Sequence, residues 1–181
     1  IVLDDLYPKV QAVRPETSLK NVVIAGFKPA AGPLDEAEPF DALLQAGTDY
    51  NPPALDPRED IAVLQYTGGT TGRSKGAMLT HRNLLANLVQ TYEFFKPVMG
   101  PGKERILTVI PLFHVFGMTC AMNYAIYTGS ESVMLPRFDL EEVLKTIKET
   151  QPTYFPGVPT MYVAITNHPK AMEYGLDSIK T

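Results

Sequence analysis

Apolar and polar positions follow two repeating patterns along most of this chain. Short apolar runs bounded by polar residues predict buried strands at residues 22–25, 61–66, 106–110, 132–135 and 153–155. Longer stretches with apolar residues three or four positions apart predict helices at residues 81–95, at residues 115–127 and from Leu140 onward, with a last helix opened by Pro159. Strands that alternate with helices are typical of an α/β fold with a layered, largely parallel sheet and flanking helices.

Polar residues and glycines mark the ends of the predicted helices. Thr80 can cap the helix that begins at His81, because its hydroxyl can accept from an N–H of the first turn. Asp139 stands just before Leu140, with Glu142 three positions later, which resembles a capping box. Gly129 is a suitable stop for the helix over residues 115–127.

Residues 28–60 break the alternation of strands and helices. This stretch holds six prolines and many acidic residues, so it predicts a long surface connection with one short helix around Phe40–Ala46 that ends at Gly47. The predicted organisation of residues 1–181 is therefore a partial domain in three parts, with an α/β edge at 1–27, the connection at 28–60 and a second α/β part at 61–181.

Composition excludes several classes of function. A hydrophobic content of 45% with 20% charged residues is ordinary for a globular protein. A net charge of -4 gives no reason to expect a nucleic-acid partner, since such binders carry basic patches. The single cysteine, Cys120, excludes an internal disulfide and a multi-cysteine metal site, and we interpret it as a small buried hydrophobic residue. The chain does not start with a signal-peptide pattern, so a cytoplasmic location is expected.

Residues 106–130 contain no charged side chain and are long enough to span a bilayer. Pro111 would break a helix in this run, and His114, Gly117 and Asn123 also interrupt it. We therefore interpret the run as a strand, a loop and a buried helix in series.

The stretch from Tyr66 to Gly76 has the composition of a phosphate-binding loop. It follows a predicted strand and contains four glycines, three threonines and one lysine. Glycines let successive backbone N–H groups turn inward around an anion, and hydroxyl and ammonium groups add donors and charge. The candidate phosphate ligands are Thr67, Gly68, Gly69, Thr70, Thr71, Gly72 and Lys75. The alternative is a surface turn rich in glycine and threonine.

This loop does not match either common nucleotide motif. Lys75 follows Gly72 by three positions and precedes Gly76, which does not fit Gly-x₄-Gly-Lys-Ser/Thr, and the dinucleotide pattern Gly-x-Gly-x-x-Gly is absent as well. The next predicted helix begins only after Thr80, so the loop itself, and not a helix N-terminus, would hold the phosphates.

A second candidate site is the sequence Pro-Leu-Phe-His at residues 111–114. It follows the strand predicted at 106–110, and α/β proteins bind ligands at the carboxyl ends of their strands. Taken alone, His114 is more simply interpreted as a hydrogen-bonded core histidine.

The residues of these segments resemble motifs of the adenylate-forming superfamily. This superfamily includes acyl-CoA synthetases, firefly luciferases and the adenylation domains of peptide synthetases. Tyr-Thr-Gly-Gly-Thr-Thr-Gly-x-x-Lys-Gly at residues 66–76 is similar to its signature loop, and Met-Leu-Thr-His-Arg-Asn at 78–83 resembles in particular the long-chain fatty-acid–CoA ligases of bacteria. Residues 111–117 and 157–160 match later motifs in order and spacing. Ser74 departs from the proline that many members have.

The resemblance implies a two-step ligation that uses ATP, Mg²⁺ and CoA. A fatty acid attacks the α-phosphate, and the acyl-adenylate then passes its acyl group to the thiol of CoA. Thr70, Thr71 and Lys75 would hold the β- and γ-phosphates, and Thr67 would help to coordinate Mg²⁺. Lys75 and His114 would be the catalytic residues, with His114 orienting the substrate carboxylate.

Other readings stay open at this point. The same chemistry could serve an aryl acid, an amino acid or luciferin, and a non-catalytic nucleotide- or anion-binding module could also carry such a loop. The family's later Tyr-Gly-x-Thr-Glu segment and catalytic C-terminal lysine do not occur in these 181 residues, so the chain alone is expected to be inactive. A homodimer and peripheral contact with a membrane also stay open.

Overall fold

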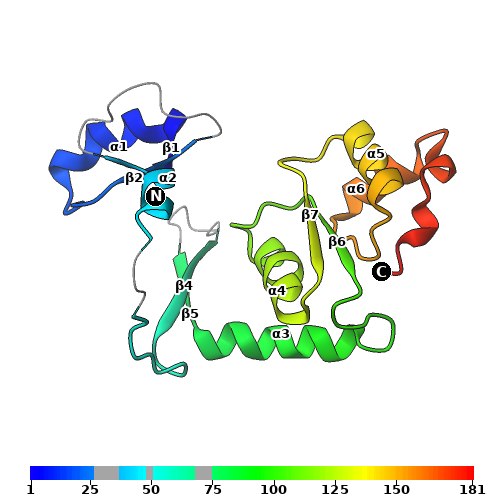
Figure 1. The fold of residues 1–181 in the computed structure, drawn as a ribbon, viewed down its shortest axis with the longest axis horizontal. Helices are drawn as coiled ribbons and strands as arrows, with labels where there is room; N and C mark the ends of the chain where they lie inside the picture. The colour runs from blue at the N-terminus through cyan, green and yellow to red at the C-terminus, as the bar shows by residue number, and fades with distance from the viewer. Residues whose placement is uncertain (27–36, 48–50, 68–74) are drawn as a thin grey trace. The chain divides into compact units, whose positions relative to one another are not determined.

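A computed structural model describes residues 1–26, 37–47, 51–67 and 75–181. They form two compact units, Ile1–Ala54 and Leu55–Thr181 (Figure 1). The boundary between the units falls inside the predicted connection. Because residues 27–36 and 48–50 lie outside the described residues, the division into segments 1–27, 28–60 and 61–181 stays a prediction.

The first unit is built on a small parallel sheet in the order β1-β2-β3. Its strands are Val2–Leu3, Val23–Ala25 and Glu38–Pro39, and its α-helices are α1, Tyr7–Val13, and α2, Phe40–Gln45. Tyr7, Val22 and Ile24 form its buried core. The strand predicted at 22–25 and the helix predicted around Phe40 are thus confirmed to within a residue or two. The two-residue strand β3 carries no apolar pattern and was not predicted.

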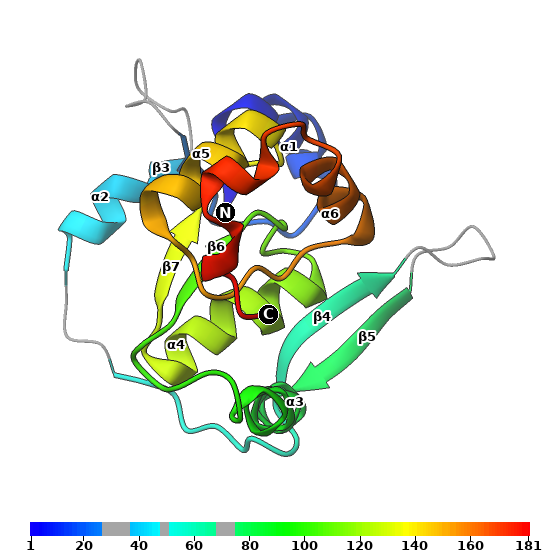
Figure 2. The same ribbon diagram turned by 90° about the vertical axis from the view of Figure 1, so that its right-hand side faces the viewer.

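The second unit begins with an antiparallel hairpin of β4, Ile61–Thr67, and β5, Lys75–Thr80. Figure 2 shows the two strands side by side, with β5 running into the helix α3. The sequence predicted β4, but it predicted no strand between Lys75 and the helix that begins after Thr80. Most of β5 is exposed and lacks alternating apolar residues, so no strand signal marks it. This hairpin is the antiparallel exception among the described strands, which otherwise pair in parallel.

Helix α3 spans His81–Phe95, the range predicted from the pattern of apolar residues. Thr80 and Asn83 form a reciprocal capping box, in which the Asn83 N–H donates to the Thr80 hydroxyl at 3.2 Å and the Thr80 N–H donates to Asn83 Oδ1 at 3.0 Å. Two donors that would otherwise have no helical partner are thereby satisfied. Leu88 is buried on the inner face, whereas Leu85 and Val89 on the predicted apolar stripe remain exposed.

Replacing Thr80 with alanine is expected to destabilise the second unit by about 1 kcal/mol, because one arm of the capping box is lost. Chemical denaturation followed by circular dichroism measures this change. Thr91→Ala is the matched control, since its hydroxyl bonds only to the Asn87 carbonyl inside the same helix. Equal stability of the Thr80 and Thr91 variants would contradict the assigned cap.

The centre of the second unit is a parallel pair, β6, Arg105–Thr108, and β7, Glu131–Met134. Tyr154 extends this sheet on the other side of β6 through a parallel bridge to Ile106, and its carbonyl accepts from the Leu107 N–H at 2.9 Å. The strand predicted at 153–155 is thus reduced to one bridging residue. Prolines at 152 and 156 flank it and have no N–H to donate to a ladder.

Helices follow each strand of this sheet. The helix predicted over residues 115–127 contains a π-helical stretch, Gly117–Asn123, followed by α4, Tyr124–Thr128. The remaining helices are α5, Leu140–Thr150, and α6, Pro159–Thr166, with short 3₁₀ turns at Ala171–Tyr174 and Leu176–Ser178. Gly129 ends α4 at a φ of 65°, and the Asp139 side chain caps α5 by accepting from the Glu142 N–H at 3.1 Å, as predicted.

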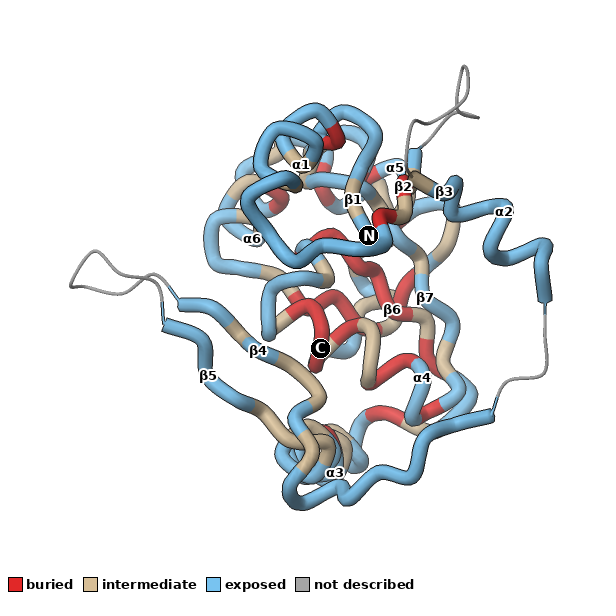
Figure 3. The backbone as a smooth tube through the Cα atoms, turned by 90° about the vertical axis from the view of Figure 1, so that its left-hand side faces the viewer, coloured by how far each residue is buried: buried red, intermediate tan, exposed pale blue. Residues whose placement is uncertain are grey.

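Two apolar clusters cover the two faces of β6. Ile106 packs with Ala121 and Tyr124 on one face, and Leu107 packs with Leu144 on the other face. Figure 3 shows the buried residues concentrated in β6 and the helical segments beside it. Within the described ranges, no helix is both long and apolar enough to cross a bilayer, so the interpretation of residues 106–130 as strand, loop and helix is confirmed.

Candidate functional site

The neck of the β4–β5 hairpin carries the two predicted phosphate-loop residues that the structure describes. Thr67 and Lys75 face each other in the ladder, and the Thr67 hydroxyl donates to the Lys75 carbonyl at 3.5 Å. Both residues are exposed, so a hydroxyl and an ammonium lie where the two strands meet the loop, a place that we call the loop mouth. The other predicted ligands lie outside the described residues, and their role stays a prediction: Gly68, Gly69, Thr70, Thr71 and Gly72.

One step further from the loop, Tyr66 and Gly76 form the next cross-strand pair. A Cβ atom added to Gly76 would lie 3.4 Å from Tyr66 Cζ, which places the tyrosine ring over the glycine backbone. Such a ring covers the gap that a strand glycine leaves and helps to fix the register of the hairpin. The position of the loop mouth is therefore set by this pair, a role that the sequence analysis did not assign.

The segment Pro111–His114 forms a tight turn after β6 that leads into the next helix. The His114 N–H donates to the Pro111 carbonyl at 3.0 Å, and the Met118 N–H donates to the His114 carbonyl at 2.9 Å. His114 Nδ1 accepts from the Phe116 N–H at 3.2 Å, so a neutral imidazole carries its proton on Nε2. Because the residue is exposed, the interpretation of His114 as a buried core histidine is wrong.

Gly117 lets the helix begin directly against this turn. A Cβ atom at this position would lie 2.5 Å from the Pro111 carbonyl oxygen and 3.1 Å from the Ile110 carbonyl oxygen. Both are backbone atoms, so no side-chain rotation could relieve the contact. No local sequence pattern marks this role of Gly117, since the close approach arises only once the chain is folded.

The predicted site residues fall on two separate structures within the second unit. Thr67 and Lys75 are brought together at the hairpin, whereas His114 lies at the carboxyl end of β6. No hydrogen bond or ion pair joins His114 to either of them. Helix α3 connects the two places, because it continues from β5 and contacts the π-helical stretch that follows His114.

The residues described here offer no cluster of three or more His, Cys, Asp or Glu side chains that could hold a metal ion. The exposed Thr67 hydroxyl is a hard oxygen ligand of the kind that Mg²⁺ accepts, and Mg²⁺ in nucleotide sites takes most of its other ligands from phosphates and water. The donor set at the loop mouth therefore fits Mg²⁺ that arrives with a polyphosphate.

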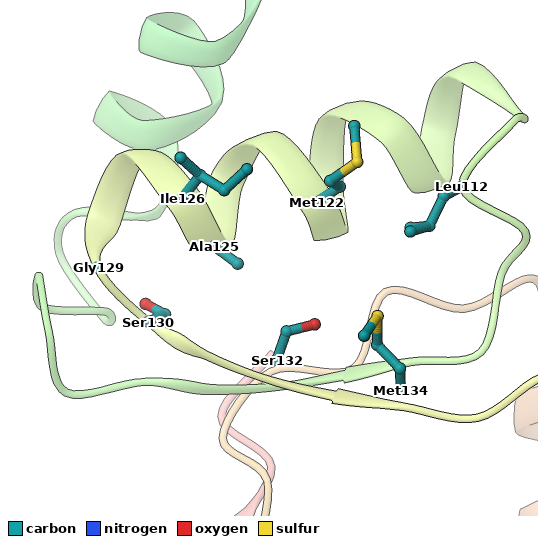
Figure 4. Close-up of a pocket in the computed structure, with 8 residues that line it drawn as sticks. All are labelled: Leu112, Met122, Ala125, Ile126, Gly129, Ser130, Ser132 and Met134. Atoms are coloured by element: carbon teal, nitrogen blue, oxygen red, sulfur yellow. The ribbon is translucent and has the colours of Figure 1, made fainter. Parts of the chain in front are cut away.

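An apolar pocket of about 430 Å³ lies between the helical segment and β7 (Figure 4). Leu112 stands at one end and Gly129 at the other, with Met122, Ile126 and Met134 along the walls. No charged side chain lines the pocket. It therefore fits an apolar group, from a ligand or from a further segment of protein, and does not suit a phosphate.

Cys120 lies in the π-helical stretch and is half-buried, so its interpretation as a small buried hydrophobic residue is only partly confirmed. Burial raises the pKa of the Cys120 thiol, and a hydrogen bond with Tyr154 only partly offsets this effect. A thiol that stays protonated is a poor nucleophile and metal ligand. Cys120 is therefore not among the candidate site residues.

The chain matches known proteins over most of its length. A family model described as AMP-binding enzyme matches residues 2–181. A long-chain-fatty-acid–CoA ligase of Bacillus subtilis (strain 168) is 50% identical over 129 residues, which are 71% of this chain and 23% of that protein. A ligase of the same name from Escherichia coli O157:H7 is 39% identical over 150 residues, which are 81% of this chain and 26% of that protein. The chain thus spans about a quarter of the length of these relatives.

Solved structures show the same fold. A long-chain-fatty-acid-CoA ligase from Archaeoglobus fulgidus superposes with a TM-score of 0.74 at 28% identity, covering 91% of this chain and 31% of that one. A red-emitting luciferase from Phrixothrix hirtus gives a TM-score of 0.78 at 25% identity, covering 98% of this chain and 34% of that one. With these matches and an α/β fold that carries the glycine- and threonine-rich loop, the chain belongs to the AMP-binding family of adenylate-forming enzymes.

Proposed function

We propose that this chain is the phosphate-loop part of a longer acid–thiol ligase that activates a long-chain fatty acid with ATP and transfers it to CoA. The observation that carries the proposal is the exposed pair of Thr67 and Lys75 at the mouth of the signature loop. An ammonium and a hydroxyl placed at one loop mouth suit the tail of a nucleoside triphosphate.

The reaction needs positioning and charge neutralisation more than a protein nucleophile. In the first step a carboxylate oxygen of the acid bonds to the α-phosphorus of ATP. The bond between the α-phosphorus and the oxygen that bridges it to the β-phosphate breaks, and pyrophosphate leaves. The Lys75 ammonium neutralises charge on the leaving pyrophosphate. In the second step the sulfur of CoA bonds to the acyl carbon, the bond from that carbon to the phosphate oxygen of AMP breaks, AMP leaves, and the thiol proton passes to solvent.

Mg²⁺, when bound to the phosphates and to Thr67, would share the neutralisation of their charge. Thr67 holds its hydroxyl at the loop mouth through the hydrogen bond to the Lys75 carbonyl. The remaining backbone N–H groups of the loop would complete the cradle for the β- and γ-phosphates.

His114 is assigned an orienting role. Its Nδ1 is engaged by the Phe116 N–H, so the neutral side chain offers an Nε2–H to a ligand from an exposed position. An N–H donor at the carboxyl edge of the sheet suits a substrate carboxylate or the phosphate that it attacks. The hydrogen bond to Phe116 keeps the ring in one orientation while it donates.

The fatty-acid assignment is supported by two relatives that are named long-chain-fatty-acid–CoA ligases, at 50% and 39% identity. The competing acids are aryl acids, amino acids and luciferin, and the luciferase neighbour shares the fold. ATP–pyrophosphate exchange by the whole protein, measured with a matched panel of these acids, separates the alternatives. We expect exchange with long-chain fatty acids and at most trace exchange with the others. Exchange only with another acid would contradict the fatty-acid assignment, and exchange with none would favour a non-catalytic binding module.

A further inference from the structure

Tyr162 on helix α6 closes back onto the turn that precedes the helix. Its hydroxyl donates to the Phe155 carbonyl at 2.8 Å and accepts from the Gly157 N–H at 2.7 Å. Its ring stands edge-on to the Phe155 ring, with centroids 5.7 Å apart. The Tyr162 side chain thus joins both ends of the turn over residues 155–157, which belongs to no helix or strand. We call this arrangement the clamp, and the turn the clamped turn.

Gly157 is matched to this tyrosine. A Cβ atom at Gly157 would lie 2.9 Å from Tyr162 Cζ and 3.0 Å from its hydroxyl oxygen. The tyrosine ring therefore occupies the space in which a side chain at residue 157 would lie. A glycine has more backbone conformations available than any other residue. The hydrogen bonds of Tyr162 therefore restrict the turn at Gly157 more than they would restrict a turn without glycine.

The clamped turn leaves the sheet at the same edge as the turn of His114. Tyr154 pairs in parallel with Ile106 of β6, so both chains run toward the same end of the sheet. After β6 the chain enters Pro111–His114, and after Tyr154 it enters the clamped turn. Ligands of open α/β sheets bind at this carboxyl edge.

The chemistry of the clamped turn suits hydrocarbon more than phosphate. Residues 154–163 include no charged side chain, and Val158, which follows the turn, is partly exposed. Within the turn, Phe155 and Pro156 are buried. An uncharged wall of this kind can pack against the apolar part of an acid, whereas a polyphosphate needs cations and free N–H donors.

We propose that the Tyr162 hydroxyl is a positioning group for the acid substrate, because it holds the turn over residues 155–157 as a fixed wall of the acid site at the same edge of the sheet as His114. Tyr162 does not itself touch reacting atoms and acts through the turn. This inference rests on the proposed function, since it assigns the wall to the acid and not to ATP.

The test uses the whole protein and the variant Tyr162→Phe, which keeps the ring and removes only the hydroxyl. We expect KM for the fatty acid to rise about three- to tenfold, the effect of one or two lost hydrogen bonds, while KM for ATP stays within about twofold. Thr166→Val is the matched control, because the Thr166 hydroxyl lies on the same helix and bonds only to helix carbonyls. This control should leave both KM values unchanged.

A second measurement checks the clamp itself. In hydrogen exchange by mass spectrometry, the peptide that holds the Gly157 amide should lose protection in Tyr162→Phe and keep it in Thr166→Val. An unchanged KM for the acid despite lost protection would overturn the positioning role, as would equal rises in KM for both substrates with a lower Tm. If the wild-type protein showed no acid-dependent exchange of pyrophosphate, the proposed function and the acid assignment would both fail, while amide exchange would still report the clamp.

Discussion

Replacing Lys75 with alanine in the whole protein is expected to lower the rate of ATP–pyrophosphate exchange by about 10²–10³-fold, the usual cost of removing one donor to developing charge. The physical reason is the loss of a positive charge at the mouth of the loop, where pyrophosphate would leave. The fold should be unaffected, since Lys75 is exposed and exposed substitutions usually change stability by less than about 0.5 kcal/mol.

Lys145→Ala is the matched control for this change. Lys145 is 73% exposed on helix α5, where it makes only a loose ion pair with Glu149 at 3.8 Å. The control should keep both stability and exchange at the wild-type level. Exchange kinetics of Lys75→Ala equal to those of the control would contradict the assignment of the loop.

Replacing Gly117 with alanine is the second change with a large expected effect. The new methyl group would lie 2.5 Å from the Pro111 carbonyl oxygen, so the turn of Pro111–His114 must move away from the helix. We expect a loss of stability of about 1–3 kcal/mol, as for other overpacked sites. Exchange activity should fall further, by about 10²-fold, since a shift of about 1 Å in a positioning group can cost that much.

Gly100→Ala provides the comparison for this variant. A Cβ atom at Gly100 meets only the flexible Lys103 side chain at 3.6 Å, an ordinary contact distance. Thermal unfolding gives the change in stability, and pyrophosphate exchange with a long-chain fatty acid gives the change in activity. If Gly117→Ala matched Gly100→Ala in both, the close approach of the helix to Pro111 would not be needed to place His114.

Much of the fold could be predicted because local chemistry marks where elements begin and end. The Thr80 and Asp139 caps and the Gly129 stop were visible in sequence, and the structure confirms all three. Strand β5 could not be predicted because its residues are mostly exposed and because its pairing with β4 depends on tertiary structure and not on a local pattern. The strand expected at residues 153–155 is only a single bridge in the structure, because the flanking prolines have no N–H to donate to a ladder.

The candidate site was only partly accessible from sequence. Composition predicted a phosphate-binding loop and its lysine, because glycines, threonines and a cation next to a strand suit an anion, and this assignment stays a prediction. The pairing of Thr67 with Lys75 needed the register of the hairpin. The contact of the Tyr162 side chain with Gly157 and the close approach of Gly117 to the Pro111 carbonyl depend on tertiary distances, which no local pattern encodes.

The most direct test of the central claim compares the binding of ATP with Mg²⁺ and of AMP to the whole protein by calorimetry, for the wild type and for Lys75→Ala. If Lys75 holds the β- and γ-phosphates, the variant should bind ATP about 10- to 100-fold more weakly, the range expected for a lost charge-assisted hydrogen bond, and should bind AMP as the wild type does. Unchanged affinity for ATP, or an equal loss for AMP, would contradict the placement of the triphosphate tail at this loop.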